Sequence, residues 1–74
     1  MRDPALVLRS KYQLVHVPNR GKVNRWASET KSLIEKGYPS EQAGMEAAQK
    51  VFRYEYKEHN VFNETPAEEI LHLL

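Results

Sequence analysis

The stretch Gly37-Tyr38-Pro39-Ser40 carries signals that end one helix and, directly afterwards, signals that begin another. Glycine is the usual residue at the left-handed position that closes a helix. Proline suits the first turn of a helix, and a serine beside it can accept a hydrogen bond from the free amide groups there. These four residues therefore predict a helical hairpin, with one helix over about residues 22–36 and a second over about 39–57.

The segment before this turn has the spacing of an amphipathic helix. Its apolar residues recur every three or four positions, and they are Val23, Trp26, Ala27, Thr30, Leu33 and Ile34. Such a stripe covers about a third of the helix circumference, which is enough to pack against one side of a core. Lys36 lies in the last turn, where a cation interacts favourably with the carbonyl end of the helix. We expect this helix to bury one narrow face.

The segment after the turn has more apolar surface than one neighbouring helix can cover. It contains two apolar rows, which are Ala43, Ala47, Val51 and Tyr54, and then Met45, Ala48, Phe52 and Tyr56. Together these rows span over half of the helix, which is wider than a surface helix needs. Unless the last helix covers the second row, that row forms an exposed apolar patch, which is typical of protein interfaces. The second row is therefore the candidate interface.

A short helix is predicted over residues 66–73. The stretch Thr65-Pro66-Ala67-Glu68 has the pattern of a capping box with proline at the first helical position. The apolar stripe of this helix contains Ala67, Ile70, Leu71 and Leu74. A helix of this length is not stable by itself in water, so we expect it to dock on the hairpin.

The residues before the hairpin leave two alternatives open. Asp3-Pro4 offers an N-cap followed by a proline at the first helical position, which begins a helix. In contrast, the β-branched and aromatic residues over Tyr12–Val17 favour an extended segment. We predict a short helical turn, or none, before Ser10, and an extended segment over Tyr12–Val17. The predicted fold class is therefore mainly α, and the alternative is α+β with an N-terminal strand.

Length and composition restrict the classes of protein. Seventy-four residues form a single small domain, residues 1–74, and chains of this size often depend on disulfides, a metal or a second subunit. The chain has no cysteine, which excludes disulfides and cysteine-based metal sites. It has no apolar run near the ~20 residues that span a bilayer, and no signal-peptide pattern. We expect a cytoplasmic protein that does not enter a membrane.

The formal net charge of +1 hides an asymmetry along the chain. Residues 1–37 carry eight Lys and Arg against three Asp and Glu, which gives +5, whereas residues 38–74 carry three against seven, which gives −4. This asymmetry fits an anionic partner, head-to-tail association between halves of opposite charge, or solvated faces that have no partner at all. The basic residues Arg9, Lys11, Arg20, Lys22 and Arg25 form the candidate anion or nucleic-acid patch.

The sequence offers little for catalysis. His16, His59 and His72 lie in three different predicted elements and share no metal-ligand spacing, and no glycine-rich phosphate loop is present. We therefore expect no enzyme, no metal, no cofactor and no small-molecule substrate. The leading hypothesis is a protein-interaction or regulatory module that forms a homodimer through its second helix. The alternative is a small nucleic-acid-binding protein that uses the basic N-terminal half.

Overall fold

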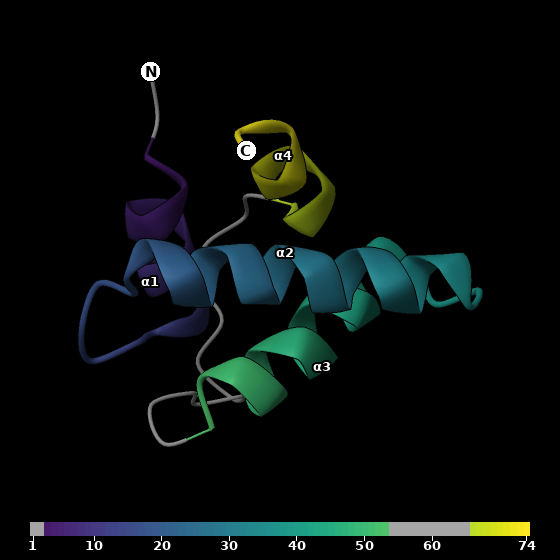
Figure 1. Cartoon of the computed structure of the whole chain (residues 1–74), viewed down its shortest axis with the longest axis horizontal. Helices are drawn as coiled ribbons and strands as arrows, with labels where there is room; N and C mark the ends of the chain where they lie inside the picture. Colours follow the sequence, from purple (N-terminus) through teal and green to yellow (C-terminus); the bar gives the residue numbers. More distant parts are fainter. Residues whose placement is uncertain (1–2, 54–65) are drawn as a thin grey trace.

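The computed structural model describes residues 3–53 and 66–74. Within these ranges the chain forms no strand, and its helices are α1 Pro4–Tyr12, α2 Arg20–Glu35, α3 Ser40–Val51 and α4 Ala67–His72 (Figure 1). The predicted mainly α fold is confirmed, with its hairpin of α2 and α3 and its short last helix.

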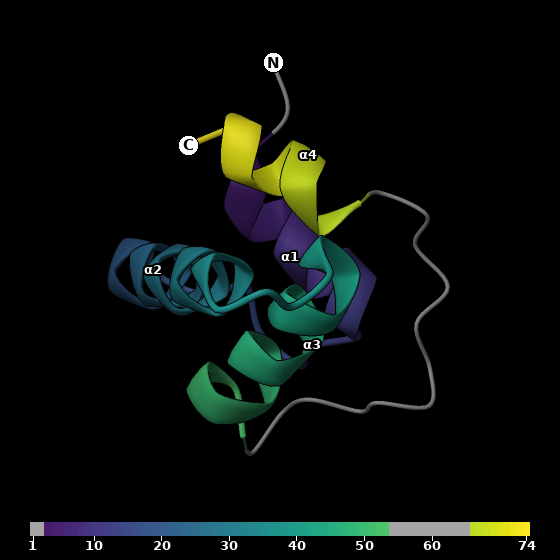
Figure 2. The same ribbon diagram turned by 90° about the vertical axis from the view of Figure 1, so that its right-hand side faces the viewer.

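One face of α2 packs against the other helices. In Figure 1, α2 lies across the middle of the molecule, with α3 crossing below it and α4 above it. Figure 2 looks nearly along α2 and shows α1, α3 and α4 together on one side of it. The buried residues of α2 are Val23, Trp26, Ala27 and Thr30. They form the narrow face that the apolar spacing predicts.

The turn between α2 and α3 is a Schellman motif. Gly37 has a φ of 103°, in the left-handed region that glycine adopts without strain. Its N–H donates to the carbonyl of Ile34 over 3.0 Å, and the N–H of Tyr38 donates to the carbonyl of Leu33 over 3.1 Å. These bonds satisfy carbonyl groups that the end of a helix leaves open. Pro39 lies just before α3, at the N-cap position, rather than within its first turn.

The N-terminal segment is a helix for longer than predicted. The Asp3 carboxylate accepts from the N–H of Ala5 over 3.0 Å, and Pro4 is the first helical residue, as the sequence indicated. The helix then continues to Tyr12, and residues 13–17 form a turn and bends without a strand, so the extended segment predicted over Tyr12–Val17 and the alternative strand are wrong. Burial of Leu8 and Tyr12, four residues apart on one helical face, favours the helix. A lone strand would also have no neighbour to pair with among the described residues.

The second helix of the hairpin ends at Val51, six residues before the predicted end. Phe52 leaves the helix with a φ of −113° and a ψ of 36°, and its side chain is buried in the core. Burial of this aromatic ring therefore outweighs continuation of the helix. The rest of the predicted helix, residues 54–57, lies outside the described residues.

The core takes large side chains from all parts of the described chain. Its largest buried apolar residues are Trp26, Tyr12, Phe52, Leu8 and Ile70. The indole Nε1 of Trp26 donates to the carbonyl of Gly44 over 3.0 Å, which joins α2 to α3. A buried indole N–H without an acceptor is costly, so this bond also fixes the orientation of the ring. Within α2, the Thr30 hydroxyl donates to the Trp26 carbonyl over 2.7 Å.

Candidate functional site

The predicted interface on α3 is largely occupied by the core of the same chain. Ala48 is fully buried, and Phe52 is 2% exposed, so neither side chain is available to a partner. Met45 is 38% exposed, and Tyr56 lies outside the described residues. The sequence showed correctly that α3 needs more than one neighbour. Among the described residues its neighbours are α2, α4 and the core residues of α1, and α1 extends further than the short helical turn predicted before Ser10.

The predicted basic patch loses one of its five members. Lys11 is 3% exposed, and its ammonium donates to the Glu41 carboxylate over 2.9 Å. It is a core residue with a paired head group rather than a surface cation. The remaining members, Arg9 on α1 and Arg20, Lys22 and Arg25 on α2, are exposed.

A hollow of about 720 Å³ lies where the starts of α1 and α2 approach the end of α4. Its lining includes Asp3, Val17, Arg20 and Leu74. Val17 is 48% exposed and Leu74 is 49% exposed, so apolar surface remains open to solvent here. The carboxylate of Asp3 and the guanidinium of Arg20 add opposite charges to the same lining. No sequence pattern predicts this hollow, because the residues that line it come from segments that are far apart in the chain.

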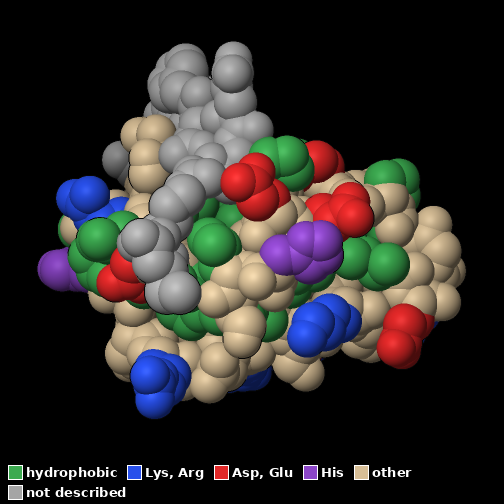
Figure 3. Space-filling view, turned by 90° about the horizontal axis from the view of Figure 1, so that it is seen from above, with side chains coloured by type: hydrophobic (Ala, Val, Ile, Leu, Met, Phe, Trp, Pro, Cys, Tyr) green, Lys and Arg blue, Asp and Glu red, His purple; other side chains and the backbone are tan. Residues whose placement is uncertain are grey.

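Exposed apolar side chains elsewhere are scattered. Leu6, Val15, Tyr38 and Met45 are exposed but do not line the hollow. Figure 3, which views the molecule from above, shows hydrophobic side chains interrupted by acidic, basic and histidine side chains. Single exposed apolar residues are common on soluble domains and need no ligand to explain them.

Glu41 connects three helices, which sequence reasoning missed. Its Oε2 accepts from Lys11 of α1, and its Oε1 accepts from the backbone N–H of Ala67 at the start of α4. The capping box predicted an internal cap for α4, but Pro66 is at the N-cap position and makes no side-chain cap bond. Thr65 lies outside the described residues. The free amide of α4 is therefore capped by a residue that lies 26 positions earlier in the chain.

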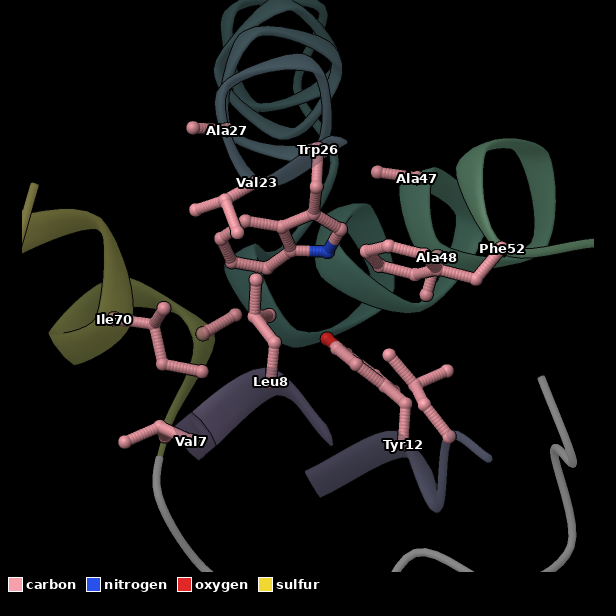
Figure 4. Packing of buried hydrophobic residues seen from close by; sticks show 12 residues of the cluster. Val7, Leu8, Tyr12, Val23, Trp26, Ala27, Ala47, Ala48, Phe52 and Ile70 are labelled. Carbon is pink, nitrogen blue, oxygen red and sulfur yellow. The ribbon is translucent and has the colours of Figure 1, made fainter. Parts of the chain in front are cut away.

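Gly44 lies one helical turn after Glu41 and lets α4 approach α3 closely. A Cβ at this position would lie 2.8 Å from the Cβ of Ala67 and 2.7 Å from the hydroxyl of Tyr12. Figure 4 shows Tyr12, Leu8 and Trp26 pointing toward one another in the core, with Ile70 and Val7 beside Leu8. The glycine that is unfavourable in a helix interior is therefore required by packing.

The described parts of the chain contain neither a group of side chains arranged to bind a metal nor a helix that could span a membrane. Over residues 3–53 and 66–74, no group of three or more His, Asp or Glu side chains has a metal-binding arrangement. His16 and His72 are exposed, and His59 lies outside these ranges. None of the described helices has both the length and the apolar character to cross a membrane.

Comparison with models of protein families, with characterised proteins and with solved structures finds no match to this chain.

Proposed function

We propose that this chain is a protein-interaction module that forms a homodimer across the hollow beside Val17 and Leu74. The observation that supports the proposal most directly is the half-exposure of these two apolar side chains within one concave surface. Concave, partly apolar surfaces are favoured places for a partner side chain to enter. The proposal keeps the homodimer predicted from the sequence but moves the contact away from α3.

The charges in the hollow suit pairing between identical copies. In a twofold dimer, residue i of one copy meets residue j of the other, and residue j meets residue i. Asp3 and Arg20 lie in the same lining, so such a dimer can place each carboxylate near the guanidinium of the other copy. Charge pairs at the rim of an interface contribute more to specificity and rate of association than to affinity.

A matched pair of valines tests the proposal. We expect Val17→Glu to weaken dimerisation at least about tenfold, because docking then buries a carboxylate against apolar surface. Val15→Glu is the control, since Val15 lies in the same connection and is 57% exposed but does not line the hollow. Analytical ultracentrifugation of the wild type and both variants over a concentration series measures the effect. A wild type that stays monomeric throughout the series contradicts the proposal.

Substitutions of the two charged residues, Asp3 and Arg20, provide a second, independent test of the proposed homodimer. Asp3→Asn removes the carboxylate charge but keeps an oxygen that can accept the N–H of Ala5, so α1 retains its cap. We expect this variant and Arg20→Gln to weaken dimerisation by a few-fold and to reduce its sensitivity to salt. An unchanged dimerisation constant in both variants shows that the charges face solvent in the dimer.

Nucleic-acid binding is a second candidate, which the exposure of Arg9, Arg20, Lys22 and Arg25 favours. A fluorescence-anisotropy titration of duplex DNA and of single-stranded RNA over a salt series tests this candidate. Phosphate contacts require affinity to fall steeply as salt rises. Binding that is absent, or that does not change with salt, rejects it.

A further inference from the structure

α4 is held by its docking site rather than by its own helical stability. It contains six residues, far fewer than an isolated helix needs in water. Ala67 and Ile70 are both fully buried, whereas Glu68 and Glu69 between them are exposed. The recognised part of α4 is therefore a small residue at its start and a branched apolar residue three positions later.

Among the described residues, the site that receives α4 is formed mainly by α3 and α1, and we call it the α4 socket. Gly44 provides a notch that fits the Ala67 methyl, since a Cβ on Gly44 would lie 2.8 Å from it. Glu41 provides the acceptor for the free N–H of Ala67, and Lys11 holds that carboxylate from the other side over 2.9 Å. Figure 4 shows Ile70 beside Val7 and Leu8.

We infer that the α4 socket is a helix-binding site that accepts α4 of a second copy as well as its own. This inference rests on the proposed self-association and names a segment that passes between the copies. Twelve residues, 54–65, separate Arg53 from Pro66 in the sequence. At about 3.3 Å per residue they can span at most roughly 40 Å. That reach exceeds the longest extent of the molecule, 29 Å, so the covalent connection permits α4 to enter a neighbouring copy.

Binding in trans competes with the helix that is already present. A tethered segment acts at an effective concentration of about millimolar, so a free peptide binds the wild type weakly. Variants that weaken only the chain's own α4 leave the socket intact and should bind a free peptide more tightly. Ile70→Val removes one methylene from the buried side chain, and Ala67→Gly removes the methyl that fills the Gly44 notch. Both changes are small enough to retain the rest of the core.

The experiment uses a fluorescein-labelled peptide with the sequence of residues 66–74. We expect the full-length Ile70→Val and Ala67→Gly variants to bind it about two- to tenfold more tightly than the wild type, measured by fluorescence anisotropy. The control peptide carries Ala67→Leu, whose side chain cannot enter the notch at Gly44, and we expect it to bind at least about tenfold more weakly. Emission from the single tryptophan, Trp26, which is buried, confirms that each variant is folded.

Each outcome separates this inference from the proposed homodimer. If neither the wild type nor the variants bind the peptide, or if the Ala67→Leu peptide binds equally well, exchange of α4 is overturned. The homodimer across the hollow then still stands or falls by ultracentrifugation. If Val17→Glu abolishes dimerisation while peptide binding is unchanged, the socket and the hollow act as separate surfaces and the inference about α4 holds.

Discussion

Gly44 is the residue at which three parts of the core approach most closely. We expect Gly44→Ala to destabilise the protein by about 1–3 kcal/mol, even though alanine is intrinsically better in a helix by about 1 kcal/mol. The added Cβ would lie 2.7 Å from the Tyr12 hydroxyl, 2.8 Å from the Ala67 Cβ and 3.3 Å from Trp26 Cζ2. Urea denaturation followed by tryptophan emission measures the change in the free energy of unfolding.

Gly21→Ala is the matched control for this prediction. Gly21 is exposed in the first turn of α2, and a Cβ there would meet only the Asn19 Oδ1, at 3.3 Å. We expect its effect to stay within about 0.5 kcal/mol, as for most surface substitutions. Equal effects of the two substitutions would show that packing at Gly44 has no special role.

Substitutions at Gln13 and Gly37 test the cost of a positive φ, and we expect them to change the stability in opposite directions. Gln13 closes α1 with a φ of 56°, where an L-residue is strained by about 1–2 kcal/mol, whereas Gly37 occupies the same region without strain. We expect Gln13→Gly to stabilise the protein by up to about 1 kcal/mol, because the gain exceeds the loss of the bond from Gln13 Nε2 to the Ser10 carbonyl. Gly37→Ala should destabilise it by about 1 kcal/mol. Thermal unfolding monitored by circular dichroism measures both, and changes of the same sign contradict the argument.

At the scale of the helices, the contact between Lys11 and Glu41 should respond asymmetrically to substitution. Lys11→Met keeps the buried stem and removes the charge, so we expect a loss below about 1.5 kcal/mol. Glu41→Ala leaves the buried ammonium without this carboxylate and removes the acceptor of the Ala67 N–H. We therefore expect the larger loss, about 2–4 kcal/mol, for Glu41→Ala. Chemical denaturation of both variants measures the difference.

A double variant tests whether Lys11 and Glu41 are energetically coupled, and a substitution of another glutamate in α3 is the control. Lys11→Met combined with Glu41→Ala should cost less than the sum of the single changes, because the second change no longer leaves a buried charge. Glu46→Ala is the control, since Glu46 is an exposed residue of the same helix, and it should change stability by less than about 0.5 kcal/mol. Additive effects of Lys11→Met and Glu41→Ala would show that the two side chains are not coupled.

The helices that could be predicted from the sequence are those with local signals. Gly37 and the spacing of Val23, Trp26 and Thr30 specify the end and the buried face of α2, and both predictions are confirmed. The extent of α1 could not be predicted, because the residues after Ser10 fit a strand as well as a helix. Burial of Tyr12 against Trp26, with ring centroids 6.3 Å apart, decides between them, and that contact is not local.

The candidate sites were less predictable because they depend on which faces remain uncovered. Phe52 and Lys11 have the side chains expected of an interface and of a basic patch, yet both are buried by elements distant in the sequence. The hollow beside Val17 and Leu74 is the opposite case, since Leu74 was predicted in the apolar stripe of the last helix and yet remains 49% exposed. Sequence periodicity identifies the faces of a helix, but the tertiary arrangement decides which face is left for a partner.

At the scale of the whole molecule, a small core makes stability sensitive to the proposed association. A chain of this size usually gains only about 3–5 kcal/mol from its own core, so binding to a second copy should raise its stability noticeably. If the proposed homodimer forms, the thermal midpoint of the wild type should rise with protein concentration, because only the folded state dimerises. Val17→Glu should remove this dependence, while Val15→Glu should retain it. Differential scanning calorimetry over a concentration series measures the midpoint, and a midpoint that is independent of wild-type concentration contradicts dimerisation of the folded chain.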